Sequence, residues 1–131
     1  MKLPRYPVYI PSKGRVDIGR FTTAQYLDED NVPFYVVVEK EEYQQYKERW
    51  GPDRVLVLPF SNRGSVIPAR NWIKQHATES GYKRHWQLDD NMAGFFRYQN
   101  GLRIRCTSSY ALRVAEDFTE RYENIAITGI E

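Results

Sequence analysis

The chain has 131 residues, of which 41% are hydrophobic and 27% are charged, and its formal net charge at pH 7 is +2. This length and composition indicate one folded domain over residues 1–131, and no apolar run approaches the roughly 20 residues that a membrane-spanning helix needs. The single cysteine, Cys106, excludes an internal disulfide and every cysteine-rich zinc module. We therefore expect a reducing, cytoplasmic location and no membrane partner.

Short β-rich runs alternate with helical patterns along the first two thirds of the chain. We predict, in chain order, a strand at 8–10, a helix at 22–27, a strand at 34–38, a helix at 41–50, a strand at 55–58, a helix at 68–80 and a strand at 85–88. The run 34–38 is continuously apolar, which is typical of a parallel strand that is covered on both faces.

The remaining third begins with a predicted hairpin at 95–105, because Asn100-Gly101 is a favoured two-residue turn. A strand is predicted at 125–127. Between them we predict a helix whose apolar stripe is Ala111, Ala115, Phe118 and Tyr122. The alternation as a whole indicates an α/β fold with a mostly parallel sheet and helices on both faces.

Polar segments follow three of the predicted strands, at 12–15, 61–65 and 89–91. Right-handed crossovers place every strand-to-helix loop of a parallel sheet at the same edge, and ligands bind at that edge. We therefore expect these three segments to meet in one site.

The segment 89–91 supplies two carboxylates and an amide oxygen, from Asp89, Asp90 and Asn91. Such hard oxygen ligands suit Mg²⁺ or Mn²⁺, whose coordination is usually completed by water and a substrate diphosphate. An Asp-rich turn without a ligand is the open alternative.

The segment 12–15 offers a glycine, exposed N–H groups and the cations Lys13 and Arg15, a combination that suits a nucleotide or its phosphates. Arg63-Gly64 has a similar character, and a solvated basic turn is the alternative in both places. Arg70 and Asn71 lie in the first turn of the predicted helix. A cation there opposes the helix dipole, and a bound anion would remove the conflict; an exposed arginine is the alternative.

The two histidines, His76 and His85, are interpreted as packed structural residues, since neither belongs to a metal motif or a catalytic triad. The hairpin carries a basic and aromatic patch that could face DNA or could be a solvated surface over a hydrophobic side. Its residues are Phe95, Phe96, Arg97, Tyr98, Arg103 and Arg105.

Three stretches, at 6–15, 70–73 and 85–91, resemble the GT-A-fold glycosyltransferases, and most of all the TET-dioxygenase-associated glycosyltransferases of DNA phages. The likeness extends from Pro7 to about Gly129. It implies a GT-A-like, Rossmann-like fold and transfer of a sugar, with glucose from UDP-glucose expected, to a hydroxyl acceptor such as a 5-hydroxymethylpyrimidine in phage DNA. A phage-encoded protein would act in the host cytoplasm.

The resemblance also implies roles for particular residues. Asp89 and Asn91 match the first and last positions of the Asp-x-Asp signature, with Asn91 replacing an aspartate, so either Asp90 or Asn91 could be the direct ligand of Mn²⁺ or Mg²⁺. Arg70 and the cation would stabilise the leaving diphosphate, and a carboxylate that the sequence does not identify would deprotonate the acceptor if the reaction inverts configuration. Arg70 and Asp90 are the expected catalytic residues. Together with the loop chemistry, the expected nucleotide-sugar site is Pro11, Ser12, Lys13, Arg15, Arg63, Gly64, Arg70, Asn71 and Asp89.

GT-A enzymes usually continue beyond the equivalent of 125–130 into an acceptor-binding half. The sequence is thus compatible with a compact enzyme, a fragment truncated on the acceptor side, or one module of an assembly of unknown oligomeric state. A non-catalytic nucleic-acid or protein interaction module is the main alternative. A nucleotidyltransferase is a third, although its long glycine-rich loop is missing.

Overall fold

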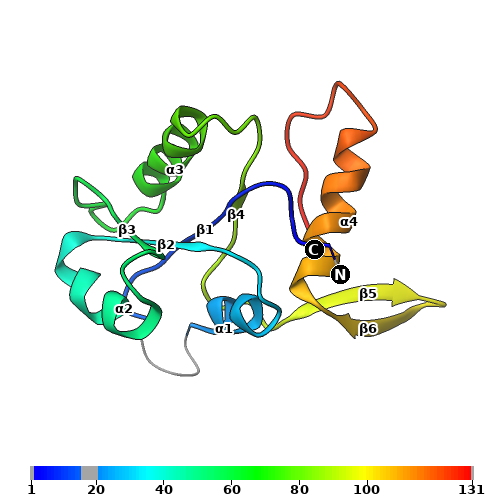
Figure 1. Ribbon diagram of the computed structural model, residues 1–131, viewed down its shortest axis with the longest axis horizontal. Coiled ribbons are helices and arrows are strands. Elements are labelled where there is room, and N and C mark those ends of the chain that lie inside the picture. Colours follow the sequence, from blue (N-terminus) through cyan, green and yellow to red (C-terminus); the bar gives the residue numbers. More distant parts are fainter. Residues whose placement is uncertain (1, 16–20, 131) are drawn as a thin grey trace.

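The computed structural model describes residues 2–15 and 21–130. Their central element is a parallel sheet with the strand order β3-β2-β1-β4. The strands are β1 (Val8–Pro11), β2 (Tyr35–Val38), β3 (Val55–Val57) and β4 (Trp86–Gln87). All three ladders are parallel, so the carboxyl ends of the strands lie at one edge (Figure 1). The α/β fold with a parallel sheet is confirmed.

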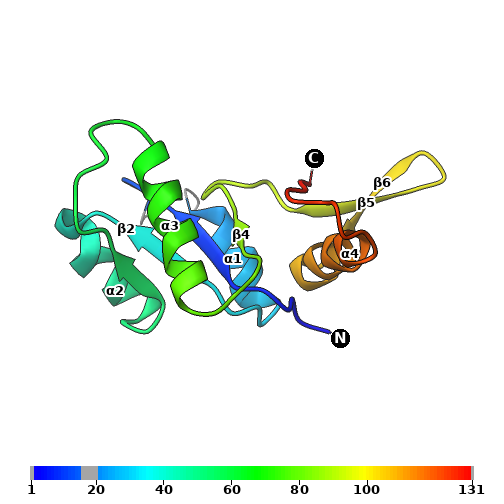
Figure 2. The same cartoon turned by 90° about the horizontal axis from the view of Figure 1, so that it is seen from above.

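Helices lie on both faces of this sheet (Figure 2). They are α1 (Thr22–Glu29), the 3₁₀ turn η1 (Lys40–Glu42) with α2 (Tyr43–Trp50), and α3 (Ile67–Glu79). A further helix, α4 (Ser108–Glu120), lies to one side of the sheet (Figure 1). The prediction of helices at 22–27, 41–50 and 68–80 is confirmed to within two residues at each end. In the described segments, no helix combines the length and the apolarity that crossing a bilayer requires.

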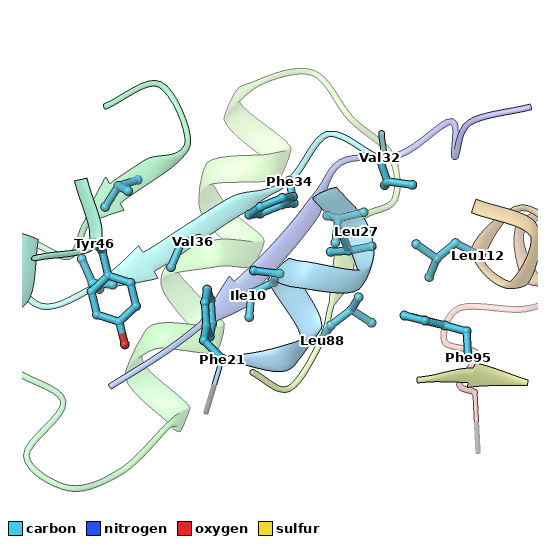
Figure 3. Close-up of a cluster of buried hydrophobic side chains, with 14 residues drawn as sticks. Ile10, Phe21, Leu27, Val32, Phe34, Val36, Tyr46, Leu88, Phe95 and Leu112 are labelled. Atoms are coloured by element: carbon cyan, nitrogen blue, oxygen red, sulfur yellow. The ribbon is translucent and has the colours of Figure 1, made fainter. Parts of the chain in front are cut away.

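Alternate residues of each central strand point to opposite faces of the sheet and are buried in two hydrophobic cores. Ile10 and Val36 point toward α1 and α2, where Leu27 and Tyr46 are buried with them (Figure 3). Tyr9 and the other residues of opposite parity pack against α3. The two-sided burial explains why the strands are continuously apolar, as a sheet between two helical layers requires.

The hairpin of β5 (Phe95–Gln99) and β6 (Leu102–Cys106) extends away from the sheet (Figure 1). Asn100 and Gly101 both have positive φ, 52° and 77°, as the predicted two-residue turn requires. Only the base of the hairpin enters the core, where Phe95 packs in the same cluster as Leu112 of α4. The hairpin prediction is confirmed.

The predicted apolar stripe of α4 is wrong at its carboxyl end, although Ala111 packs against the core. The rings of Phe118 and Tyr122 contact each other at a tilt of 56° and are about half exposed. The buried positions are instead Ser108, Ser109, Leu112, Glu116 and Thr119. Because most of that face is polar, a search for apolar periodicity selects the wrong side of the helix.

The predicted strand at 125–127 is also wrong, since residues 123–130 contain no helix or strand. The guanidinium of Arg84 donates to the backbone oxygens of Ile125 (2.7 Å) and Ala126 (3.4 Å), so these carbonyls have a partner without a sheet ladder. Ile127 is 91% exposed. Because its β-branched side chains are not buried, little packing free energy favours pairing of this segment with the sheet.

Candidate nucleotide-sugar site

The loop after β1 and the turn after β4 meet at the carboxyl edge of the sheet. Ser12 Oγ donates to Asp90 Oδ2 at 2.9 Å, and Arg15 Nε lies 3.3 Å from Asp90 Oδ1. Both oxygens of Asp90 therefore have a partner in the loop after β1, whose residues 12–15 are called the first loop below. Segments 78 residues apart in the chain are tied together here.

Tyr46 of α2 holds the first loop through two hydrogen bonds of its hydroxyl. Its hydroxyl lies 2.8 Å from Ser12 Oγ and accepts the backbone N–H of Arg15 at 3.0 Å. Since the single hydroxyl proton of Ser12 goes to Asp90, the phenol of Tyr46 must be the donor toward Ser12. Burial raises the pKa of Tyr46, which keeps this proton in place. The sequence showed Tyr46 only as part of a helical stripe, and an aromatic residue with a polar tip was the available signal.

Arg70, on the first turns of α3, reaches the same turn after β4. Its guanidinium donates to Asp89 Oδ1 and to Gln87 Oε1, both at 3.3 Å. Gln87 in turn donates through Nε2 to the backbone oxygen of Arg70 at 3.2 Å. The carboxylate of Asp89 thus provides a negative charge next to the cation at the start of α3. Gln87, which sequence reasoning missed, orients the guanidinium.

The backbone of the turn after β4 is held by the start of α1. The buried Thr23 donates through Oγ1 to the backbone oxygen of Asp89 and accepts the N–H of Met92 at 2.9 Å. Thr22 donates to the backbone oxygen of Met92 at 2.7 Å. These bonds leave the side chain of Asp89 free to face solvent, where it is 73% exposed.

Glu39, just after β2, connects the first loop to the loop after β3. Its carboxylate lies 3.1 Å from Lys13 Nζ and accepts the backbone N–H of Asn62 at 3.3 Å. A hydrogen bond from Ser61 and the ammonium of Lys13 hold the pKa of Glu39 below its usual value. The first loop is further fixed where Gly14, with φ of +67°, donates its N–H to Glu42 at 2.6 Å.

Other predicted site residues stand apart from this network. Arg63, Asn71 and Asn91 are exposed at the same general edge, on the loop after β3, on α3 and on the turn after β4. Within residues 2–15 and 21–130, no side-chain bond joins them to the Ser12–Asp90 cluster. Pro11 is the last residue of β1, and Gly64, with φ of +82°, forms the turn beside Arg63.

The histidines lie beneath the edge as packed residues. His76 Nδ1 is 2.8 Å from the hydroxyl of Tyr9, and burial raises the pKa of Tyr9 to about 12. His85 Nε2 lies 2.9 Å from Gln87 Nε2 and must be the acceptor of that amide N–H. Burial lowers the pKa of His85 and so favours the neutral ring that can accept. His85 therefore completes a chain of contacts through Gln87 to Arg70.

Among the described residues, no three His, Cys, Asp or Glu side chains gather as a metal site would require. The oxygens exposed for a cation are those of Asp89 and Asn91, because both oxygens of Asp90 are engaged by Ser12 and Arg15. Two hard oxygen ligands fit Mg²⁺ or Mn²⁺ when water and a diphosphate complete the shell.

A comparison with protein families finds one match that spans almost the whole chain. The family described as TET-Associated Glycosyltransferase matches residues 6–131. No curated protein and no solved structure matches the sequence significantly. A match of this extent includes every strand and helix described above, and the chain belongs to the TET-associated glycosyltransferase family.

Proposed function

We propose that this glycosyltransferase moves glucose from UDP-glucose to the hydroxyl of a 5-hydroxymethylpyrimidine in DNA, with the help of Mn²⁺ or Mg²⁺. One observation supports the donor site above all. The loop after β1 and the first turns of α3 both contact the turn after β4, through Ser12 to Asp90 and Arg70 to Asp89. In parallel α/β sheets this edge is where ligands bind.

In this proposal the nucleotide lies along the first loop, with its phosphates toward Arg70. Lys13 and Arg15 supply cations, and the glycine backbone permits close approach of the phosphates. Arg63 and Gly64 border the site from the loop after β3, and Asn71 borders it from α3. Among residues 2–15 and 21–130, one carboxylate contacts the guanidinium of Arg70, and a guanidinium has further donor N–H groups for a diphosphate.

The chemistry follows from the charge that develops. Breaking the bond between sugar and phosphate leaves negative charge on the diphosphate, and Arg70 lies where a fixed guanidinium would stabilise it. A divalent cation held by Asp89 and Asn91 would add Lewis-acid stabilisation of the same oxygens. The contacts of Asp90 favour a role in holding the first loop. Its roles as a metal ligand and as a catalytic residue stay predictions.

The test is transfer itself. The chain is incubated with UDP-glucose, Mn²⁺ and an oligonucleotide containing 5-hydroxymethylcytosine, and mass spectrometry follows the gain of one hexose on the oligonucleotide. The proposal expects a hexose product that requires the hydroxymethyl group. Hydrolysis of UDP-glucose without transfer would reject the DNA acceptor. Neither reaction, from folded protein that still binds DNA, would favour the non-catalytic interaction module.

A further inference from the structure

The hairpin β5–β6 presents a face that the donor site does not use. The ladder pairs Phe96 with Arg105 and Tyr98 with Arg103, so these four side chains lie on one face of the ribbon. Arg97, one position along, lies on the other face, above the ring of Tyr110 in α4. The four residues Phe96, Tyr98, Arg103 and Arg105 are called the outer face below.

Rings and guanidinium groups alternate across the outer face. The guanidinium carbon of Arg103 lies 4.4 Å from the centre of the Phe96 ring, and that of Arg105 lies 5.8 Å from it. Tyr98 is 80% exposed, and both arginines are exposed. Tyr98 is therefore an aromatic surface that no described neighbour covers.

The charge of this hairpin identifies the kind of partner. Residues 95–106 contain three arginines and no aspartate or glutamate, although the whole chain carries a net charge of only +2. In the described residues, no carboxylate forms an ion pair with Arg103. Guanidinium groups match phosphates, and exposed aromatic rings stack on unpaired bases. Both features together fit a single strand of nucleic acid better than a lipid or an acidic protein surface, which offers no planar base.

The base of the hairpin follows directly on the turn that bears Asp89 and Asn91. Only residues 92–94 separate Asn91 from β5, and α1 fixes this connector. Met92 is bound by Thr22 and Thr23, and the hydroxyl of Tyr26 donates to the backbone oxygen of Ala93 at 3.0 Å. The seven residues from Asn91 to Tyr98 span at most about 25 Å, which is about seven nucleotides at the spacing within one strand of a duplex.

We propose that the outer face of the hairpin, chiefly Tyr98 and Arg103, binds a single-stranded stretch of nucleic acid beside the turn at Asp89–Asn91. This rests on the proposed function, since it names the surface that holds the acceptor strand. Arg103 contacts phosphate, and Tyr98 stacks on a base that is unpaired. The binding is independent of the nucleotide sugar, because the outer face shares no residue with the donor network.

The experiment measures fluorescence anisotropy of a short labelled single-stranded oligodeoxynucleotide, and of an abasic strand of the same length, with the full chain. Two double variants are compared, Tyr98→Ala with Arg103→Gln and, as a matched control, Tyr122→Ala with Arg121→Gln. The control changes the same residue types at exposed positions just beyond the carboxyl end of α4. Calorimetric titration with UDP is run on every protein.

We expect the hairpin variant to bind the base-containing strand at least tenfold more weakly and the control to bind like the parent chain. Arg103→Gln alone should lower the slope of log affinity against log salt by about 0.7 between about 50 and 200 mM KCl. Tyr98→Ala alone should weaken the base-containing strand and leave the abasic strand unchanged.

Equal losses in the hairpin and control variants would overturn the proposal, and so would equal affinity of the parent chain for the two strands. Absence of oligonucleotide binding by the parent chain would also overturn it. So would a hairpin variant that loses binding to anionic phospholipid vesicles but still binds the oligonucleotide like the parent chain. UDP affinity should be unchanged in the hairpin variant. A parent chain that binds the strand but not UDP would contradict the proposed function and leave the hairpin assignment standing.

Discussion

Gln87 is the residue through which the structure controls the position of Arg70. It accepts from the guanidinium and donates to the backbone oxygen of the same residue. Gln87→Leu keeps much of the volume and removes both bonds. We predict that it lowers kcat for transfer about tenfold, since a hydrogen bond to a charged group contributes about 1.5–3 kcal/mol, with less than about a twofold change in KM for UDP-glucose.

Steady-state kinetics with two further variants checks this. Gln87→Glu, which retains an acceptor for Arg70, should recover part of kcat. Gln75→Leu changes an exposed glutamine on α3 whose side-chain amide donates to Glu79, and it should leave kcat unchanged. A Gln87→Leu enzyme with parental kcat would show that Arg70 needs no such support.

The prediction about the metal site concerns Asp89. Asp89→Asn keeps the shape of the side chain and removes its charge, so a cation bound by this oxygen is held less tightly. We expect UDP affinity without metal to be nearly unchanged and the gain in affinity on adding Mn²⁺ to be largely lost, as measured by calorimetry. Asp53→Asn, in the exposed turn before β3, is the control. The same Mn²⁺ effect in the Asp89→Asn protein would remove this residue from the metal site.

At the scale of elements, one buried carboxylate of α4 binds both the segment before β1 and a residue of β4. Glu116 is 3% exposed and accepts the backbone N–H groups of Arg5 (2.7 Å) and Tyr6 (3.2 Å) and the indole N–H of Trp86 (2.8 Å). Glu116→Ala leaves these donors without an acceptor. We predict a loss of about 2–3 kcal/mol in the free energy of unfolding, measured by urea denaturation.

Glu123→Ala, which removes an exposed carboxylate beyond the end of α4, should change that free energy by less than about 0.5 kcal/mol. If the two variants lose equally little, Glu116 does not hold α4 in place.

The elements also show what the sequence could and could not predict. The buried strands and the turn at Asn100-Gly101 were predictable because local chemistry and fold agree there. The buried face of α4 was not, because Glu116 is buried for hydrogen bonding and not for apolarity. The strand at 125–127 failed because Arg84, distant in the chain, binds those carbonyls. In the site, charged residues after strands could be located, whereas their supports Tyr46 and Gln87 depend on contacts that no local pattern encodes.

At the scale of the whole molecule, the loops of the carboxyl edge are held together by charge, and this gives stability a pH dependence. The folded pKa of Glu39 lies below its ordinary value of 4.5. The unfolded chain therefore binds more protons near that pH, and stability rises with pH through this range. The contribution of Glu39 is complete above the unfolded pKa and is lost as pH falls through the folded pKa.

Glu39→Gln tests this contribution through thermal unfolding followed by circular dichroism. The parent chain should have the higher Tm at about pH 6, and the difference should shrink toward about pH 3.5 as the parent carboxylate becomes protonated. A difference in Tm that stays constant over this range would show that the charge of Glu39 contributes nothing.

The central claim is that three loops at one edge of the parallel sheet form a binding site for a nucleotide diphosphate. Calorimetric titration of the full chain with UDP, with and without Mn²⁺, tests it most directly. The account predicts saturable binding of one UDP per chain that Mn²⁺ tightens and that Arg70→Ala weakens. No heat of binding in either condition, from protein that unfolds cooperatively, would contradict it.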